Sequence, residues 1–265
     1  MGRNAIESAQ TCLDSRGITV KIISNGNLQE VDINSGWLDG QGIFETIKTV
    51  NNLPYALGRH LDRAQNAALH FGIELPDRDV INSCVGKLLK AEPHSSGVLR
   101  ISFADDSRWL MVHLAYEAPT EAAEIRIHPE CVDGAVFKRF PYTQRIAILK
   151  DARAAGFDDA LTFNESGNIC EGSVTNFIAK VGEEWITPPT SDGLLPGILR
   201  QLLIENNLVK ERSIHRSEVS DISSAFLLSS LRMAQSIAAI DGRALHLSHA
   251  YAEQIHALAV KYSVG

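Results

Sequence analysis

In the first half of the chain, some segments have the hydrophobic pattern of β-strands and others have apolar residues at helical spacing. Residues 18–23 and 28–33 are rich in β-branched side chains and flank an Asn-Gly turn, which predicts a β-hairpin. Later segments alternate between this strand pattern and apolar side chains at helical spacing. They predict strands at 43–50, 53–57, 97–103 and 109–115, and helices at 59–72 and 77–91.

Each predicted helix has an apolar stripe and a boundary signal. The helix at 59–72 ends at a glycine that suits a C-cap, and the helix at 77–91 begins at Asp77, a candidate N-cap. The side chains expected on the buried faces are Leu61, Ala64, Ala68 and Leu69 in the first helix, and Val80, Cys84, Leu88 and Leu89 in the second.

A polar, proline-containing segment then interrupts the pattern and predicts a domain linker. We expect an N-terminal α+β domain at 1–116, a linker at 117–123 and a second domain at 124–265. The second domain is predicted to contain strands at 124–128, around Glu171, shortly after a Ser/Thr/Asn cluster at 173–176, at 213–216 and at 224–229. Its predicted helices lie at 143–155, from 195–198 onward and at 247–262.

Composition narrows the classes of function. The net charge is −7 and no dense run of Lys or Arg occurs, which argues against nucleic acid and anionic membranes as partners. The N-terminus lacks an apolar targeting region, and no segment approaches the roughly 18 apolar residues of a membrane span, so we expect a cytoplasmic protein. The four cysteines and nine histidines are dispersed without metal-ligand spacing, so no metal site is predicted.

Lys138 is a candidate nucleophile. It follows the apolar residues 135–137 and precedes Arg139, and both burial and a neighbouring positive charge lower the pKa of a lysine. The alternative is an ordinary surface lysine at the end of a strand, which position alone favours. Lys150, on the helix predicted at 143–155, is a competing choice with a solvated setting.

Glu171 lies on a strand predicted to be buried, where an unpaired carboxylate is costly. A cation is therefore expected beside it. The protonated ring nitrogen of pyridoxal phosphate is one candidate, and an Arg or Lys in a structural ion pair is at least as well supported.

A second group of residues has the chemistry of a phosphate site. Pro196 and Gly197 open a helix whose first backbone N–H groups, with those of Ile198, favour an anion. Arg63 could add a guanidinium and Ser230 a hydroxyl. For Arg63, the alternative is a solvated helix face.

Together these segments resemble the class IV, fold-type IV family of pyridoxal-phosphate enzymes. The family includes branched-chain aminotransferases, D-amino acid aminotransferases and 4-amino-4-deoxychorismate lyases. The matching text is DGQGIFETIK (39–48), RHLDRAQNAA (59–68), Lys138, FDDALTFNESGNICEGSVTNFIA (157–179), LLPGILRQLLI (194–204) and SSLRMAQSIAAIDGR (229–243).

The resemblance implies a smaller N-terminal domain and a larger C-terminal domain with a β-barrel-like core, usually assembled as a homodimer. It implies that Lys138 forms the Schiff base with the cofactor and moves protons, and that Glu171 pairs with the ring nitrogen. The implied phosphate site consists of Arg63, Gly197, Ile198, Leu199 and Ser230. Many relatives have threonine at the position of Leu199, so one hydroxyl contact is missing here.

Among these branches, Phe44 and Thr46 look most like the lyases that form p-aminobenzoate and pyruvate, with Thr46 assisting proton delivery. Arg100 or Arg108 is then the candidate for the substrate carboxylate, because the turn at 101–108 lacks the Arg-Gly text of many relatives. An aminotransferase for D-amino or branched-chain substrates is the alternative. A binding module without turnover is a third reading, against which Lys138 and Glu171 both argue.

Overall fold

Two β-sheets organise the described chain, residues 19–33 and 37–262 of a computed structural model. The expectations for the N-terminal lead-in, Cys12 and Ile18 lie outside these residues. The described chain divides into two units. The first contains the described part of residues 1–118, together with Lys138–Pro141 and Tyr262, and the second contains Pro119–Phe137 and Tyr142–Lys261.

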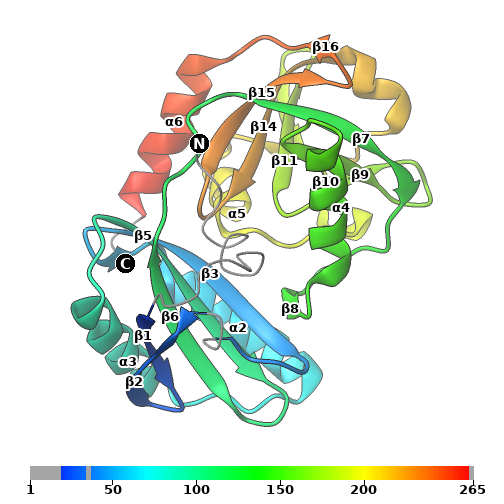
Figure 1. Cartoon of the computed structure of the whole chain (residues 1–265). Helices are drawn as coiled ribbons and strands as arrows, with labels where there is room; N and C mark the ends of the chain where they lie inside the picture. Colours follow the sequence, from blue (N-terminus) through cyan, green and yellow to red (C-terminus); the bar gives the residue numbers. More distant parts are fainter. Residues whose placement is uncertain (1–18, 34–36, 263–265) are drawn as a thin grey trace. The chain divides into compact units, whose positions relative to one another are not determined.

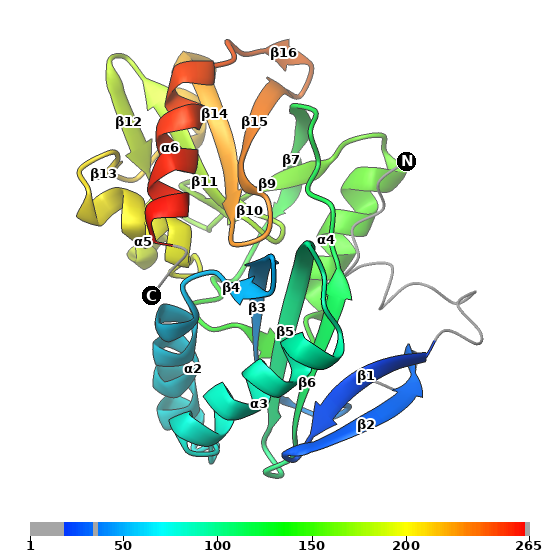
Figure 2. The same ribbon diagram turned by 90° about the vertical axis from the view of Figure 1, so that its left-hand side faces the viewer.

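The first unit is a seven-stranded sheet with two helices. Its strand order is β2-β1-β6-β5-β3-β4, and β8 pairs with β3. Helix α2 packs against β3, while α3 packs against β1 and β6 (Figure 2). The elements are β1 (Thr19–Ser24), β2 (Asn27–Asp32), β3 (Gly42–Val50), β4 (Leu53–Pro54), α2 (Leu57–Phe71), α3 (Arg78–Ala91), β5 (Ser96–Ala104), β6 (Trp109–Ala115) and β8 (Arg139–Phe140).

The second unit is a nine-stranded mixed sheet with the order β10-β9-β7-β15-β14-β11-β12-β13, to which β16 adds beside β15. Helix α4 packs against β7 and β9, α5 against β14, and α6 against β15 (Figure 1). Its strands are β7 (Ala123–Cys131), β9 (Asp159–Phe163), β10 (Ile169–Gly172), β11 (Asn176–Val181), β12 (Glu184–Thr187), β13 (Lys210–Glu211), β14 (Ile222–Ser229), β15 (Met233–Ile240) and β16 (Arg243–Ala244). Its helices are α4 (Thr143–Ala154), α5 (Ile198–Glu205) and α6 (His249–Lys261), with 3-10 turns at Thr190–Asp192 and Arg216–Asp221.

The α+β class predicted from the sequence is confirmed, and most element boundaries agree to within a few residues. The prediction that Leu69 and Val80 lie on buried helix faces is wrong, because these residues are 73% and 43% exposed. Ala67 is buried in α2, and Ile81 and Val85 are buried in α3.

The strand predicted at 213–216 is wrong. His215 makes an isolated bridge to Asn168, and then its side chain caps the turn Arg216–Asp221 by accepting the N–H of Ser217. Glu218 returns a hydrogen bond to the N–H of His215, and this capping box turns the chain out of an extended path.

One central strand of the second unit was not predicted. β15 pairs with both β14 and β7, and its sequence alternates small residues with Met, Gln and Ile. Alanine and serine have low β-propensity, so the strand is held by its neighbours more than by its own side chains.

Candidate active site

A buried carboxylate orients Arg63 in the first unit. Glu45 is 1% exposed on β3, between Phe44 and Thr46. Arg63 donates from Nε to Oε1 at 2.8 Å and from Nη2 to Oε2 at 2.6 Å, which makes a two-bond fork. His60, three residues earlier on α2, contacts Oε2 through Nδ1 at 2.7 Å. Residues i and i+3 share a helix face, so both side chains meet Glu45 from α2.

The charges of this cluster follow from its burial and its ion pair. Burial raises the pKa of Glu45, but Arg63 and the hydrogen bond from His60 outweigh it and bring the pKa to about 2. Burial lowers the pKa of His60, and the hydrogen bond to Glu45 offsets this only in part. Glu45 is therefore ionised at neutral pH, and Arg63 is its fixed counter-charge.

Four of the residues selected from the sequence gather around β3 in the first unit. In the register of β3 with β5, Thr46 is opposite Arg100, and Phe44 is two residues away on the same strand face. The Cζ atom of Arg100 lies 3.5 Å from the centroid of the Phe44 ring, and Nζ of Lys138 lies 4.8 Å from it. The carbonyl of Lys138 accepts the N–H of Phe44 at 2.9 Å.

The local setting of Lys138 differs from the expected end of a strand. Lys138 directly precedes β8 instead of following a strand, because residues 133–138 are irregular. The hydrogen bond to Phe44 and the pairing of β8 with β3 hold this segment in place. Arg139, the neighbouring cation, lies over the ring of Phe71 with Cζ 4.2 Å from its centroid.

The two arginines considered for a substrate carboxylate have different surroundings. Arg100 is 6% exposed and donates to Ser102 as well as stacking on Phe44. Arg108 is exposed at the turn between β5 and β6, and it pairs with Asp39 at 2.8 Å and Asp106 at 2.7 Å. The hydrogen bond that Arg108 donates to Asp106 contributes most to the raised pKa of Arg108.

In the second unit, Glu171 is buried on β10 among several donors. Its Oε1 lies 2.8 Å from Nη2 of Arg145. Its Oε2 accepts Nδ2 of Asn176 at 3.0 Å and the N–H of Leu195 at 3.3 Å. Arg145 is therefore one cation beside this carboxylate, and the sequence analysis considered such a structural pair alongside the cofactor's ring nitrogen.

Asn176 connects Glu171 to the start of α5. Its Nδ2 also donates to the carbonyl of Leu195 at 2.8 Å, next to the helix start. A Cβ atom on Gly197 would lie 1.8 Å from Oδ1 of Asn176, so only glycine fits there without a shift. Gly197, the N-cap of this eight-residue helix, has no side chain of its own with which to cap it.

Ile198 and Leu199 are the first two residues of α5, with both side chains buried. Their side chains are thus unsuited to binding a polar group, and the backbone of this first turn carries the polar chemistry. Ser230, the remaining phosphate candidate, is half-buried in the turn between β14 and β15.

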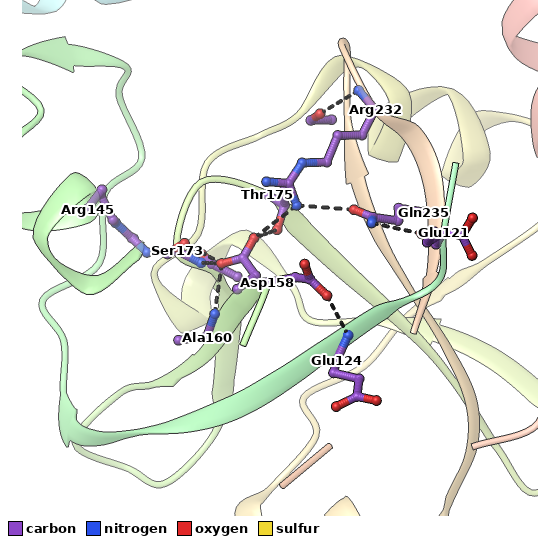
Figure 3. A network of polar contacts seen from close by, with 12 residues as sticks. Glu121, Glu124, Arg145, Asp158, Ala160, Ser173, Thr175, Arg232 and Gln235 are labelled. Atoms are coloured by element: carbon purple, nitrogen blue, oxygen red, sulfur yellow. Dashed lines mark hydrogen bonds and ion pairs between the residues drawn. The ribbon is translucent and has the colours of Figure 1, made fainter. Parts of the chain in front are cut away.

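A polar network beside β10 fixes the loop that follows Glu171. Asp159 is fully buried and accepts hydrogen bonds from the backbone N–H of Ser173 at 2.9 Å and from the hydroxyl of Thr175 at 3.2 Å. Arg232 donates to Asp159 and to Gln235, each at 3.3 Å. Figure 3 shows this chain of contacts from Thr175 through Arg232 to Gln235.

Four residues that contact Arg63 or Glu171, or share their partners, had no role assigned from the sequence: Glu45, His60, Arg145 and Asn176. Glu45 had a visible signal, since it is a carboxylate inside a predicted strand, directly after the apolar residues Ile43 and Phe44. Asn176 lies in a recognised Ser/Thr/Asn cluster but had no assigned contact. Arg145 had none, because an arginine in the first turn of a helix is ordinarily solvated.

The described residues contain neither a metal-ligand cluster nor a membrane-spanning helix. In residues 19–33 and 37–262, no group of three or more His, Cys, Asp or Glu side chains is arranged to hold a metal ion. No helix in that part of the chain has the length and apolar character to cross a membrane.

Comparison with known proteins gives one family match and a divided set of relatives. The model of the family described as amino-transferase class IV matches residues 42–240. The aminodeoxychorismate lyase of Bacillus subtilis is 26% identical over 193 residues, which cover 64% of this chain and 66% of the relative. The probable branched-chain-amino-acid aminotransferase of Rickettsia bellii is 35% identical over 105 residues, which cover 38% of this chain and 36% of the relative. Both matches cover less than two thirds of the relative's length.

Structural comparison extends over nearly the whole chain. The branched-chain aminotransferase of Thermoproteus uzoniensis matches with a TM-score of 0.82 at 21% identity, covering 92% of this chain and 96% of that one. At this identity the likeness bears on the fold alone, and it confirms the predicted two-domain α+β architecture.

Proposed function

Because the chain belongs to the class IV aminotransferase family, we propose that it is a lyase that converts 4-amino-4-deoxychorismate to p-aminobenzoate and pyruvate. The family's cofactor is pyridoxal phosphate, which when bound serves as an electron sink for negative charge at the carbon that bears the substrate amine. The remaining steps depend on residues of this chain.

The residues present fit this cofactor. The buried carboxylate of Glu171 suits a protonated ring nitrogen. For the phosphate we propose the guanidinium of Arg63, the hydroxyl of Ser230 and the start of α5 at Gly197, Ile198 and Leu199, whose N-cap is a glycine. Lys138 supplies the amine that bonds to the cofactor.

Lys138 and Thr46 would divide the proton transfers of the lyase reaction. Lys138 takes the proton from the carbon that bears the amine, and the C–O bond to the enolpyruvyl group then breaks. The hydroxyl of Thr46 assists delivery of a proton to the departing group, which becomes pyruvate while the six-membered ring becomes aromatic. This assignment agrees with the position of Thr46 on the same face of β3 as Phe44.

The observation that carries the choice of a lyase is the stack of Arg100 on Phe44, with 3.5 Å between Cζ and the ring centroid. A buried guanidinium beside an aromatic face suits a flat ring that bears a carboxylate. The side chain of a branched-chain amino acid would not use the aromatic face, whereas its carboxylate, like that of the lyase substrate, could pair with Arg100. Arg100 is therefore the preferred contact for the substrate carboxylate, whereas Arg108 already has two carboxylate partners at the surface.

An aminotransferase acting on branched-chain or D-amino acids is the second candidate. It is supported by the 35% identity to the Rickettsia bellii protein, although that match covers only 38% of this chain. The homodimer expected for the family and the cytoplasmic location are further proposals, and the former is tested by sedimentation of the purified protein.

Product analysis tests the proposed reaction. The purified, cofactor-loaded protein is incubated with aminodeoxychorismate, and separately with a branched-chain or D-amino acid and 2-oxoglutarate. We expect p-aminobenzoate and pyruvate in equal amounts from the first reaction and no glutamate from the second. Formation of glutamate without p-aminobenzoate would contradict the lyase proposal and support the aminotransferase.

A further inference from the structure

Arg145 and Glu171 form a buried ion pair that the proposed function does not use. Nη2 of Arg145 lies 2.8 Å from Oε1 of Glu171, and the two side chains are 4% and 5% exposed. Burial of this kind keeps solvent from screening the attraction. Solvent therefore screens the charge of Arg145 only weakly at Glu171.

The two oxygens of Glu171 have different partners. A permanent cation contacts Oε1, whereas Oε2 accepts hydrogen bonds from two neutral donors, Nδ2 of Asn176 and the backbone N–H of Leu195. The carboxylate therefore shares its charge with Arg145. A carboxylate with neutral partners alone would offer a stronger attraction to a protonated ring nitrogen.

The placement of Arg145 is specific. It stands in the first turn of α4, extends toward the segment that carries Ser173 (Figure 3), and directs Nη1 at the carbonyl of Gly172, the neighbour of Glu171, at 3.5 Å. A buried guanidinium is unfavourable without such partners. Helix α4 thus places the positive charge of Arg145 beside the carboxylate of Glu171.

We propose that Arg145 is a positioning residue that weakens the hold of Glu171 on the protonated ring nitrogen of pyridoxal phosphate by sharing the carboxylate charge. The proposal rests on the proposed role of Glu171 and adds a residue that tunes it. A weaker hold makes the ring nitrogen less basic, so the cofactor withdraws electrons less strongly than it would beside a carboxylate with neutral partners.

The test compares the affinity of the full-length protein, freed of cofactor and reloaded, for pyridoxal phosphate and for its analogue with CH in place of the ring nitrogen. Because the two ligands differ only at this ring position, the ratio of their dissociation constants reports the contribution of the ring nitrogen to binding. In Arg145→Gln, which retains a hydrogen-bond donor without charge, we expect the preference for pyridoxal phosphate to rise by roughly tenfold or more. Arg145→Lys should keep the ratio of the unmodified protein.

Two further variants complete the comparison. In Glu171→Gln the ratio should no longer depend on the residue at 145, so Glu171→Gln and Glu171→Gln/Arg145→Gln should agree. Arg126→Met removes an exposed Arg–Asp pair of the same unit and should leave the ratio unchanged. The pH titration of the bound cofactor's absorption should move to higher pH in Arg145→Gln, because its ring nitrogen holds the proton more tightly.

An unchanged or lower ratio in Arg145→Gln would overturn the proposal, since it would leave Arg145 a purely structural partner. If Arg145→Gln does not fold, the unmodified protein decides. Charge sharing predicts a preference for pyridoxal phosphate below about tenfold, and a preference of about a hundredfold or more contradicts it. All these readouts are binding and absorption, so failure of the lyase reaction would leave them interpretable.

Discussion

Arg63 donates two hydrogen bonds of 2.8 and 2.6 Å to the carboxylate of Glu45, which is almost completely buried. The fork fixes the plane of the guanidinium, which the proposed phosphate contact requires. His60 adds a third contact to the same carboxylate. The position of Arg63 is therefore determined by β3 as much as by its own helix.

Replacing Glu45 with Gln is expected to lower the free energy of unfolding at pH 7 by about 3 kcal/mol, because Arg63 would lose a buried counter-charge. The pKa of Glu45 in the fold is about 2, below its ordinary 4.5. Its stabilisation is thus complete above pH 4.5 and is lost as the pH falls toward 2. Urea unfolding at several pH values should show the two proteins converging in acid, with Glu183→Gln, an exposed change, as the control. A constant difference across this range would contradict the account.

His113 should make the first unit sensitive to mild acid. It is fully buried, contacts Thr49 Oγ1 at 2.7 Å and the carbonyl of Glu92 at 2.6 Å, and burial lowers its pKa to about 4. The unfolded chain takes up this proton near pH 6.5 and the folded chain only near pH 4. Between these values, stability falls with pH by about 3 kcal/mol in total from this group.

The variant His113→Gln is the check on that assignment. Its free energy of unfolding should be lower at pH 7, but its slope between pH 6.5 and 4 should be flatter than that of the unmodified protein. Equal slopes would show that other groups carry the pH dependence.

The same substitution should have opposite effects at two glycines. Gly197→Ala places a Cβ atom against Asn176 and should cost about 1–3 kcal/mol of stability. It should also weaken cofactor binding, since Asn176 holds Glu171. Gly86→Ala, inside α3 with no atom within 4 Å of the new Cβ, should stabilise the protein by about 0.5–1 kcal/mol. Thermal unfolding and cofactor titration of both variants test these predictions. A change of stability in the same direction in both variants would contradict them.

Lys138→Ala should abolish the visible absorption band of the lysine-bound cofactor and its fixation by borohydride. Lys150→Ala, the matched lysine on α4, should retain both. Should the band persist in Lys138→Ala and vanish in Lys150→Ala, the nucleophile would be Lys150 instead.

Elements with strong local signals could be predicted from the sequence. Elements whose structure depends on contacts between distant segments could not. The hairpins and the helices at 59–72 and 77–91 have clear periodicity, whereas β15 is a chain of small residues held by β14 and β7. For the site, the residue types of Lys138, Glu171 and Arg63 were recognisable from their patterns. Arg145 and Glu45 were not assigned, because an ion pair across 26 or 18 residues of sequence has no periodicity.

The measurement that bears most directly on the proposed function is a competition in one vessel. The cofactor-loaded protein receives equal concentrations of aminodeoxychorismate, a branched-chain amino acid and 2-oxoglutarate, and p-aminobenzoate and glutamate are followed together. The account predicts p-aminobenzoate as the main product, a rate reduced by roughly a hundredfold or more in Thr46→Val, and glutamate at the level of the Lys138→Ala control. Glutamate formed faster than p-aminobenzoate would contradict the lyase assignment.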